Sequence, residues 1–227
     1  MAKGSASSIA GVLLFIVTVG STLWGQTPPL DRHPDTSGWQ DLFGRDLSKA
    51  EFPAGEWTME DGVLHAVGHE TIWTKASYGD FVLDLEFKVG KGSNSGVFLR
   101  AGNTADISSA LEIQIHETTD GGRIGMVGAL YDAKAPSRSV AKPAGQWNHY
   151  TITCRGSRLY LVFNGVQVLN VDLDDWSEGH KNPDGTPNKF PVPLKDYARQ
   201  GPIGLQGIHG QAGQPVWFRN LKIRVLP

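Results

Sequence analysis

The chain has 227 residues, a length that suits one larger all-β domain or two small domains. It is 40% hydrophobic and 19% charged, with 28 glycines and 13 prolines, which excludes a disordered or fibrous chain and indicates a globular protein rich in turns. The formal net charge is −2 and no run of Lys or Arg occurs, so the composition argues against nucleic acid as a partner.

The first 25 residues have the features of a secretory signal peptide. Lys3 precedes an apolar stretch at 9–20, shorter than the roughly 20 residues of a membrane span, and small and polar residues follow it. We expect cleavage after about residue 25, a periplasmic or secreted protein and no stable membrane insertion; a retained anchor is the alternative. Residues 26–38, rich in Pro and Asp, are expected to link this signal to one domain at 39–227.

Beyond residue 38 the sequence predicts short strands and almost no helix. Asp61-Gly62 and Asn164-Gly165 each predict a hairpin turn, because such pairs tolerate the positive φ of tight turns. The insertion at 177–201 carries four prolines, and a loop of this length is usually functional or disordered. The expected strand segments are 57–68, 80–90, 95–102, 111–117, 127–133, 147–156, 157–165, 166–173, 202–207 and 215–226.

This succession of strands predicts an all-β sandwich or jelly roll. Each sheet would bury one face, and the other face would be solvated or form a concave polar binding surface. The single cysteine, Cys154, excludes an intramolecular disulfide and a zinc site built from cysteines. No GxSxG, P-loop, GxGxxG or HExxH motif occurs, and no pattern indicates an oligomeric state.

The stretch LEIQIHE at 111–117 is the strongest candidate for a functional strand. Its side chains alternate, so Glu112, Gln114 and His116 share one face while the aliphatic residues share the other. Glu and Gln are poor strand formers, which favours a site over an ordinary solvated face. A bulge would be needed to turn Glu117 onto the same face.

Other candidates come from neighbouring segments. In NSGVFLR, Asn94, Gly96 and Arg100 share one parity, and a glycine inside a strand often permits the close approach of a ligand or another backbone. An Arg100 ion pair with Glu112 is the structural alternative. Three further polar residues lie at strand ends or in a Gly-rich turn: Tyr131, Gln206 and His209.

Five segments resemble the 3-keto-disaccharide hydrolase family, which has a concanavalin A-like jelly roll. They are DLFGRDLSKAEF with WTMEDGVL, then YGDFVLDLEFKVGKGSNSGVFLR, LEIQIHE with GALYDA, NPDGTPNKFPVPLKDYARQGPIGLQ, and HG with PVWFRNLKI. The resemblance runs from about Trp39 to Leu226. The family usually has an acidic residue between LQ and HG, where this chain has Gly207-Ile208, and the turn after HG is longer here.

The resemblance implies cleavage of a glycosidic bond in a sugar whose C3 hydroxyl is oxidised to a ketone. A base removes the acidified C2 hydrogen, the enolate expels the C1 substituent, and water adds back. Substrate contacts are expected from Asn94, Gln114, Glu117, Gln206 and His209. The expected roles are base for Glu112 or His116, oxyanion stabilisation for Arg100 with Asn94 or Gln114, and protonation of the leaving group for Tyr131, His209 or Glu117.

The resemblance assigns no definite cofactor. A divalent cation could replace the oxyanion donors, and Glu112, His116 and Glu117 could hold one. Two other functions are compatible with the sequence. Glu112 and Glu117 have the spacing of the two carboxylates of jelly-roll retaining glucanases, although Gln114 replaces the usual acid between them. A non-catalytic carbohydrate-binding module on the same fold is the other alternative.

Overall fold

The computed structural model of the protein describes residues 30–117, 124–209 and 214–227, together with Met1. Apart from Met1, the expected signal peptide at 1–25 lies outside the described residues, as does the first part of the expected linker. In the described part of the chain, no helix has the length and apolar character needed to cross a membrane.

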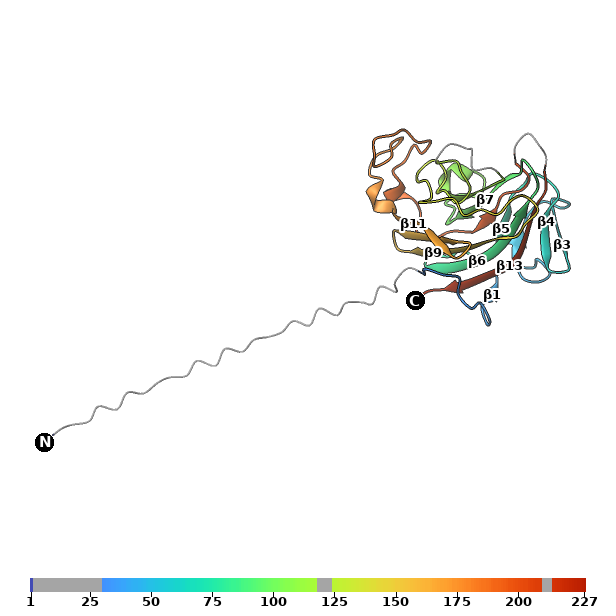
Figure 1. Ribbon diagram of the computed structural model, residues 1–227, viewed down its shortest axis with the longest axis horizontal. Helices are drawn as coiled ribbons and strands as arrows, with labels where there is room; N and C mark the ends of the chain where they lie inside the picture. Colours follow the sequence, from blue (N-terminus) through green and yellow to red (C-terminus); the bar gives the residue numbers. More distant parts are fainter. Residues whose placement is uncertain (2–29, 118–123, 210–213) are drawn as a thin grey trace.

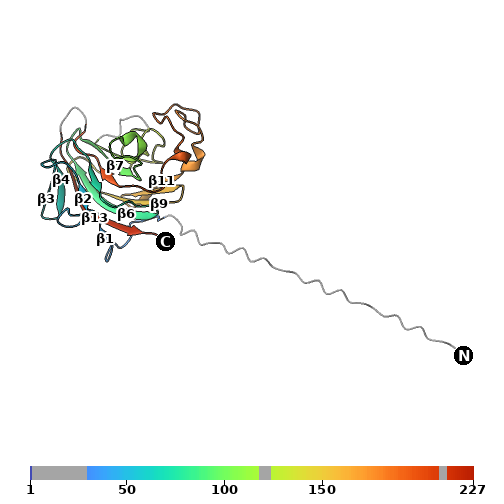
Figure 2. The same cartoon turned by 180° about the vertical axis from the view of Figure 1, so that it is seen from behind.

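Two antiparallel sheets pack face to face (Figure 1, and from behind in Figure 2), and the described residues contain short 3-10 turns but no α-helix. The larger sheet has eight strands in the order β11-β10-β9-β6-β13-β4-β3, with β1 paired to β13. Its strands are β1 (Gln40–Asp41), β3 (Trp57–Glu60), β4 (Val63–Ala66), β6 (Phe81–Val89), β9 (Asn148–Arg155), β10 (Arg158–Phe163), β11 (Val166–Asp172) and β13 (Val216–Val225).

The smaller sheet has five strands in the order β2-β5-β12-β7-β8. Short 3-10 turns lie at η1 (Ile107–Ser109), η2 (Leu173–Asp175) and η3 (Leu194–Asp196). The strands of the smaller sheet are β2 (Ala50–Glu51), β5 (Ile72–Thr74), β7 (Asn94–Leu99), β8 (Leu111–His116) and β12 (Gly204–Leu205).

The core lies between the two sheets and follows from alternation along the strands. On β6, Phe81, Leu83, Leu85 and Phe87 are fully buried in the core, and the residues between them face outward. The main core cluster contains inward-facing residues of both sheets, so one hydrophobic core serves the whole domain. The all-β sandwich expected from the sequence is confirmed.

Most expected strands and both hairpin turns are confirmed. Asp61-Gly62 and Asn164-Gly165 have positive φ at both residues, as two-residue hairpins of this kind require. The expected strand at 127–133 is wrong: the segment forms only isolated bridges at Leu130, because Gly128 and Asp132 adopt left-handed φ values of 83° and 60°. The sequence reading also missed the short strands β1, β2 and β5.

Candidate active site

The polar residues of β8 lie on the outer face of the five-stranded sheet. Leu111, Ile113 and Ile115 belong to the main core cluster, so alternation sends Glu112 and Gln114 to the opposite face. Both residues are nevertheless buried, at 8% and 3% exposure. Segments that cross this face therefore remove them from solvent, which distinguishes a site from an ordinary solvated strand.

Strand pairing builds polar rows across this face. On β7 and β8, Asn94 pairs with His116 and Gly96 pairs with Gln114. The chain after β12 extends both rows, because the Gln206 N–H donates to Gly96 O at 2.9 Å and the His209 N–H donates to Asn94 O at 3.1 Å. The structure thus brings together residues that lie more than 100 positions apart in the sequence.

Gly96 makes room for the Glu112 carboxylate. A Cβ atom at this position would lie 2.8 Å from Glu112 Cγ and closer still to Oε1, so any larger residue would displace the acid. The sequence predicted a close approach at Gly96, and the group that approaches is the side chain of Glu112. Beside it, the rings of Phe98 and Trp73 stack with centroids 5.6 Å apart and form an apolar wall.

Burial brings the pKa of the Glu112 carboxyl close to neutral pH. Desolvation raises the pKa of Glu112 from 4.5 to about 7, and the positive charge of Lys189 opposes this rise without cancelling it. Lys189 Nζ lies 3.9 Å from Glu112 Oε2. A carboxyl with a pKa near 7 is partly ionised at physiological pH, so it can both accept and return a proton.

Lys189 comes from the long loop at 177–201 and was not singled out by sequence reasoning. Its Nζ lies 4.3 Å from the centroid of the Tyr131 ring, and its backbone N–H donates to Asp132 Oδ2 at 2.5 Å. The Tyr131 N–H donates to Glu112 O at 2.9 Å, which brings the phenol ring beside the acid. The pKa of Tyr131 is raised by burial and then by the negative charges of Glu112 and Asp132. The only sequence signal for Lys189 was the unusual length of its loop.

Amide groups surround the carboxylate. The Gln114 side chain lies 3.1 Å from Asn94 Oδ1. When its amide nitrogen is turned toward Glu112, it donates to Glu112 Oε1 at a distance of 3.1 Å. Gln206 is 7% exposed, and its Oε1 is buried with no hydrogen-bond partner in the described part of the chain. A buried acceptor of this kind is satisfied when a ligand hydroxyl donates to it.

Arg100 is not part of this cluster, which corrects the role expected for it. It adopts φ +51° just beyond β7, and this left-handed residue breaks the alternation that would have placed it beside Glu112. Its guanidinium is buried and donates to Gly79 O at 2.8 Å, to Gly156 O at 2.7 Å and to Asp80 Oδ1 at 3.1 Å. Arg100 therefore joins strand ends and turns and does not stabilise an oxyanion.

Glu117 also lies apart from Glu112. No bulge turns it onto the polar face; its Oε2 accepts a hydrogen bond from the Gly92 N–H at 3.2 Å in the turn between β6 and β7. Alternation sends Glu117 to the side of the chain opposite Glu112, and its carboxylate is held at the turn between β6 and β7, whereas a retaining glycosidase needs its two carboxyl groups about 5 to 5.5 Å apart. The arrangement therefore disfavours the glucanase alternative.

His116 is half-buried at the end of β8, and His209 is exposed.

The sequence profile of the 3-keto-alpha-glucoside-1,2-lyase-like domain matches residues 38–224. The chain belongs to this family. A curated member, the 3-keto-disaccharide hydrolase of Bacteroides thetaiotaomicron, is 25% identical over 224 residues, covering 84% of this chain and 75% of that protein. Membership in this carbohydrate-active family implies a sugar substrate.

Solved structures agree with the family and the fold. A Parabacteroides distasonis protein whose glycosyl-hydrolase assignment is provisional superposes with a TM-score of 0.79 at 40% identity, covering 83% of this chain and 99% of that one. The carbohydrate recognition domain of Emp47p shares the fold alone, with a TM-score of 0.51 at 11% identity over 85% of this chain and 96% of that one. The family assignment therefore agrees with the sandwich built above.

The departure from the family pattern at Gly207 has a packing reason. A Cβ atom there would lie 2.6 to 2.7 Å from backbone atoms of residues 68–70, so an acidic side chain has no room at this position. The longer turn that follows includes residues 210–213, which lie outside the described residues. In the described part of the chain, one group of His and acidic side chains is close enough to share a metal ion: His33, Asp84 and His149. This group lies at the other sheet and not at Glu112.

Proposed function

We propose that this family member hydrolyses the glycosidic bond of 3-keto-glycosides, including 3-keto-disaccharides, with Glu112 as the base. The observation that carries the proposal is a buried carboxyl with a pKa of about 7, 3.9 Å from the ammonium group of Lys189. A base of this strength suits removal of a hydrogen next to a ketone, and a nearby cation suits the charge that then develops.

The chemistry runs in two stages. Glu112 takes the C2 hydrogen, electrons move onto the C3 ketone oxygen, and Lys189 stabilises the resulting enolate. The enolate then expels the C1 oxygen, which receives a proton, and a double bond forms between C1 and C2. Water then adds its oxygen to C1 and gives a proton to the group that protonated the departing oxygen, while Glu112 returns its proton to C2. These transfers restore the ketone, return both side chains to their starting states and release a 3-keto sugar.

The remaining side chains have defined parts in this proposal. Tyr131, held beside Glu112 and Lys189, protonates the departing oxygen. Gln206 accepts a hydrogen bond from a sugar hydroxyl through its otherwise unsatisfied Oε1, and Asn94 and Gln114 bind neighbouring hydroxyls. We further propose, from the N-terminal sequence, that the protein acts in the periplasm or outside the cell.

The deciding experiment compares hydrolysis of a 3-keto-glucoside with that of its unoxidised parent, with and without a chelator. Cleavage of the keto sugar alone, lost in Glu112→Gln, is the expected result. Cleavage of the parent at a similar rate would contradict the enolate route. Saturable binding of the keto sugar without turnover would instead identify a binding module. Loss of activity with chelator would mean that a metal ion, and not Lys189, stabilises the oxyanion.

A further inference from the structure

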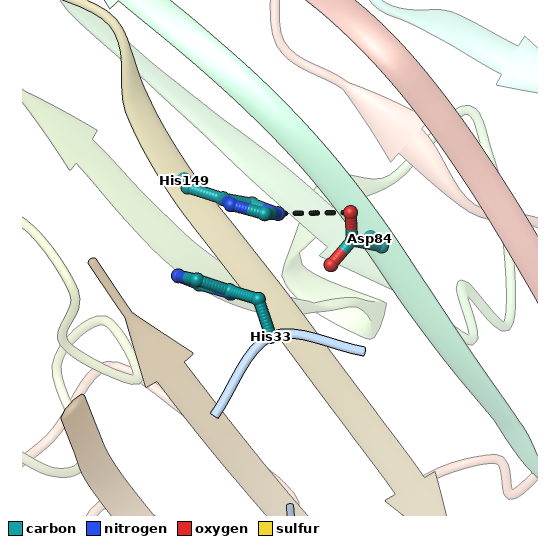
Figure 3. Close-up of side chains that lie close together, drawn as sticks. All are labelled: His33, Asp84 and His149. Carbon is teal, nitrogen blue, oxygen red and sulfur yellow. Dashed lines mark hydrogen bonds and ion pairs between the residues drawn. The ribbon is translucent and has the colours of Figure 1, made fainter. Parts of the chain in front are cut away.

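A second polar cluster lies on the outer face of the eight-stranded sheet, away from Glu112. Residue His33, in the segment 30–38 that precedes β1, stacks on His149 of β9 with ring centroids 3.5 Å apart and planes inclined by 11°. Figure 3 shows both rings beside Asp84 of β6. Asp84 faces outward from its strand but is only 3% exposed, so this cluster covers it.

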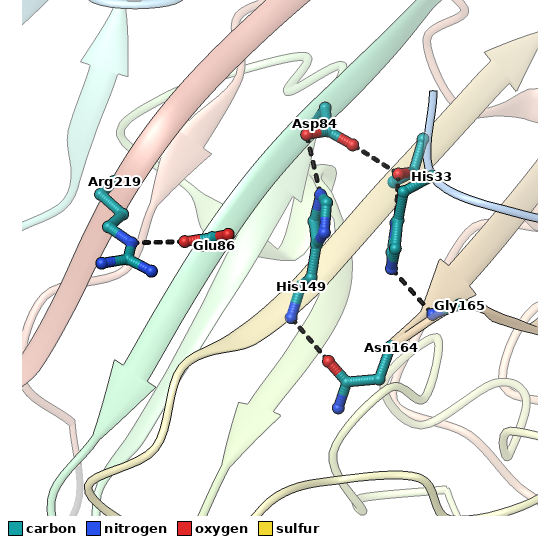
Figure 4. A network of polar contacts seen from close by, with 8 residues as sticks. His33, Asp84, Glu86, His149, Asn164, Gly165 and Arg219 are labelled. Carbon is teal, nitrogen blue, oxygen red and sulfur yellow. Dashed lines mark hydrogen bonds and ion pairs between the residues drawn. The ribbon is translucent and has the colours of Figure 1, made fainter. Parts of the chain in front are cut away.

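Figure 4 shows the hydrogen bonds of this cluster, and the chemistry of the donors and acceptors sets the direction of each bond. The Gly165 N–H, which can only donate, points to His33 Nε2 at 2.8 Å, so Nε2 carries no proton. The proton of the neutral ring is then on Nδ1, which donates to Thr151 Oγ1 at 2.8 Å. The Thr151 hydroxyl donates to Asp84 Oδ2 at 2.5 Å, and His149 Nε2 donates to Asp84 Oδ1 at 2.8 Å.

This polarity argues against a metal site, although donor atoms of His33, Asp84 and His149 lie within 4.8 Å of one another. A metal-bound imidazole normally donates the N–H of its second ring nitrogen. Here a metal on His33 Nδ1 would force a proton onto Nε2, which would then face the Gly165 N–H. Both Asp84 oxygens are also already used as acceptors.

We propose that these side chains form a pH-operated clasp, which holds residues 30–38 against the sheet while His33 is neutral and releases them when it is protonated. A second proton on His33 would enter at Nε2, where it opposes the Gly165 N–H and breaks that hydrogen bond. The new charge would also lie against the stacked His149 ring. The clasp goes beyond the proposed function and is independent of it.

Charged groups from every neighbouring element bear on His33. Asp84 and Glu86 of β6 favour its protonation, whereas His149 of β9 and Lys142 before β9 oppose it. Glu86 is paired with Arg219 of β13, and Lys222 of β13, in register with Asp84, is paired with Asp41.

Burial, followed by His149, lowers the pKa of His33 from 6.5 to about 4. A depressed histidine pKa means that the released segment binds the proton more tightly than the clasped one does. The clasp is therefore at full strength above pH 6.5 and weakens as the pH falls toward 4.

The test is amide hydrogen exchange by NMR on the full chain between pH 7 and pH 4, expressed as protection relative to an unstructured amide. Protection of the Gly165 amide should stay constant from pH 7 to about pH 6.5 and then fall by about tenfold per pH unit toward pH 4. The Asn164 amide is the internal control, because it donates to His149 O and not to His33. Its protection should stay constant, and the ¹⁵N shifts of His33 should report Nε2 as the unprotonated nitrogen at pH 7.

Two variants separate the clasp from general acid loosening. In His33→Gln the amide supplies one donor and one acceptor but does not titrate, so Gly165 protection should no longer depend on pH; His33→Ala should leave Gly165 unprotected at every pH. The exposed His180→Asn, whose φ of 57° suits Asn, should behave as the parent. Equal acid loosening in parent and His33→Gln, or constant Gly165 protection in the parent, would overturn the proposal. Stabilisation by zinc that is lost in His33→Ala would overturn it in favour of a metal site.

Discussion

At the scale of single residues, Glu112 is governed by a competition between burial and charge. Desolvation pushes its pKa up, and Lys189 pulls it down. Desolvation wins because the Lys189 side chain is 40% exposed and water screens its charge, whereas that of Glu112 is 10% exposed. The result is a Glu112 pKa of about 7, so a change to either partner should alter the pH dependence of catalysis.

Replacing Lys189 by Met should shift and weaken the proposed activity. Without the cation the pKa of Glu112 rises above about 7, so the rising limb of kcat/KM against pH moves to higher pH. The enolate also loses its donor, and we expect a fall of about a hundredfold or more at neutral pH. The exposed Lys195→Met in the same loop is the control, and an unchanged pH profile in Lys189→Met would remove Lys189 from the site.

Glu112→Gln should stabilise the fold at alkaline pH. The raised pKa of Glu112 means that the native protein holds a proton that the unfolded chain releases, so stability falls as the pH rises from 4.5 through about 7. The neutral amide avoids this loss, which amounts to at most about 3 kcal/mol. Urea unfolding at pH 5 and pH 8 measures this loss of stability. The exposed Glu51→Gln is the control. If the parent and Glu112→Gln were equally stable at pH 8, the burial argument would be contradicted.

At the scale of elements, β7 shapes the site through a missing side chain. In Gly96→Ala the added methyl group would occupy the space of the Glu112 carboxylate, so the acid should move by about 1 Å or more. A displacement of this size costs about a hundredfold in rate, measured as kcat. Gly79→Ala is the matched control, since its added methyl would meet only Arg199 O at 3.8 Å. Full activity in Gly96→Ala would mean that the carboxylate position does not matter.

The loop at 177–201 places Lys189 because it is braced internally. Asn182, 3% exposed, accepts hydrogen bonds from Trp176 Nε1 at 2.8 Å and from Asn188 Nδ2 at 3.0 Å. Trp176, Phe190 and Leu194 belong to the main core cluster, which holds the loop against the domain. The loop is therefore an ordered part of the fold.

Asn182→Ala should loosen this loop and leave the sheets intact. Buried donors left without a partner cost about 1 to 3 kcal/mol, and part of this cost should appear as local opening of the loop. We expect a higher KM and faster proteolysis within 177–201, with little change in the unfolding midpoint of the sheets. Val192→Ala, at an exposed position in the same loop, is the comparison; identical proteolysis of the two variants would contradict the bracing role.

At the scale of the whole molecule, Arg100 joins parts of both sheets. Its guanidinium is 1% exposed and connects the end of β7 to Gly79 and Asp80 before β6 and to Gly156 between β9 and β10. Arg100→Met leaves the carbonyls of Gly79 and Gly156 without this donor and removes one of the two donors to Asp80 Oδ1, and we expect a loss of about 2 to 4 kcal/mol in thermal or urea unfolding.

The control for Arg100 is Arg45→Met, because the Arg45 side chain is 92% exposed and should contribute almost nothing. If instead Arg100→Met kept its stability and lost its activity, the residue would return to the catalytic group from which the structure removes it.

Local patterns in the sequence were enough to predict the class of fold and the position of the polar strand. Period-two alternation assigned Leu111, Ile113 and Ile115 to the core and Glu112 and Gln114 to the other face, because a strand exposes successive side chains to opposite sides. Asn-Gly and Asp-Gly pairs located the hairpin turns for an equally local reason. These are properties of short stretches of chain, so no tertiary contact was needed to infer them.

Which side chains meet at the site is known from the folded structure and not from these local patterns. Alternation predicted that Arg100 would lie on the polar face, but its left-handed φ directs the side chain elsewhere. Lys189, which does contact Glu112, lies in a loop 77 positions further along the chain. The neutral pKa of Glu112 likewise depends on desolvation by segments that cross the sheet. Long-range contacts, and the water they exclude, are set by how loops pack over the sheet, which no local periodicity encodes.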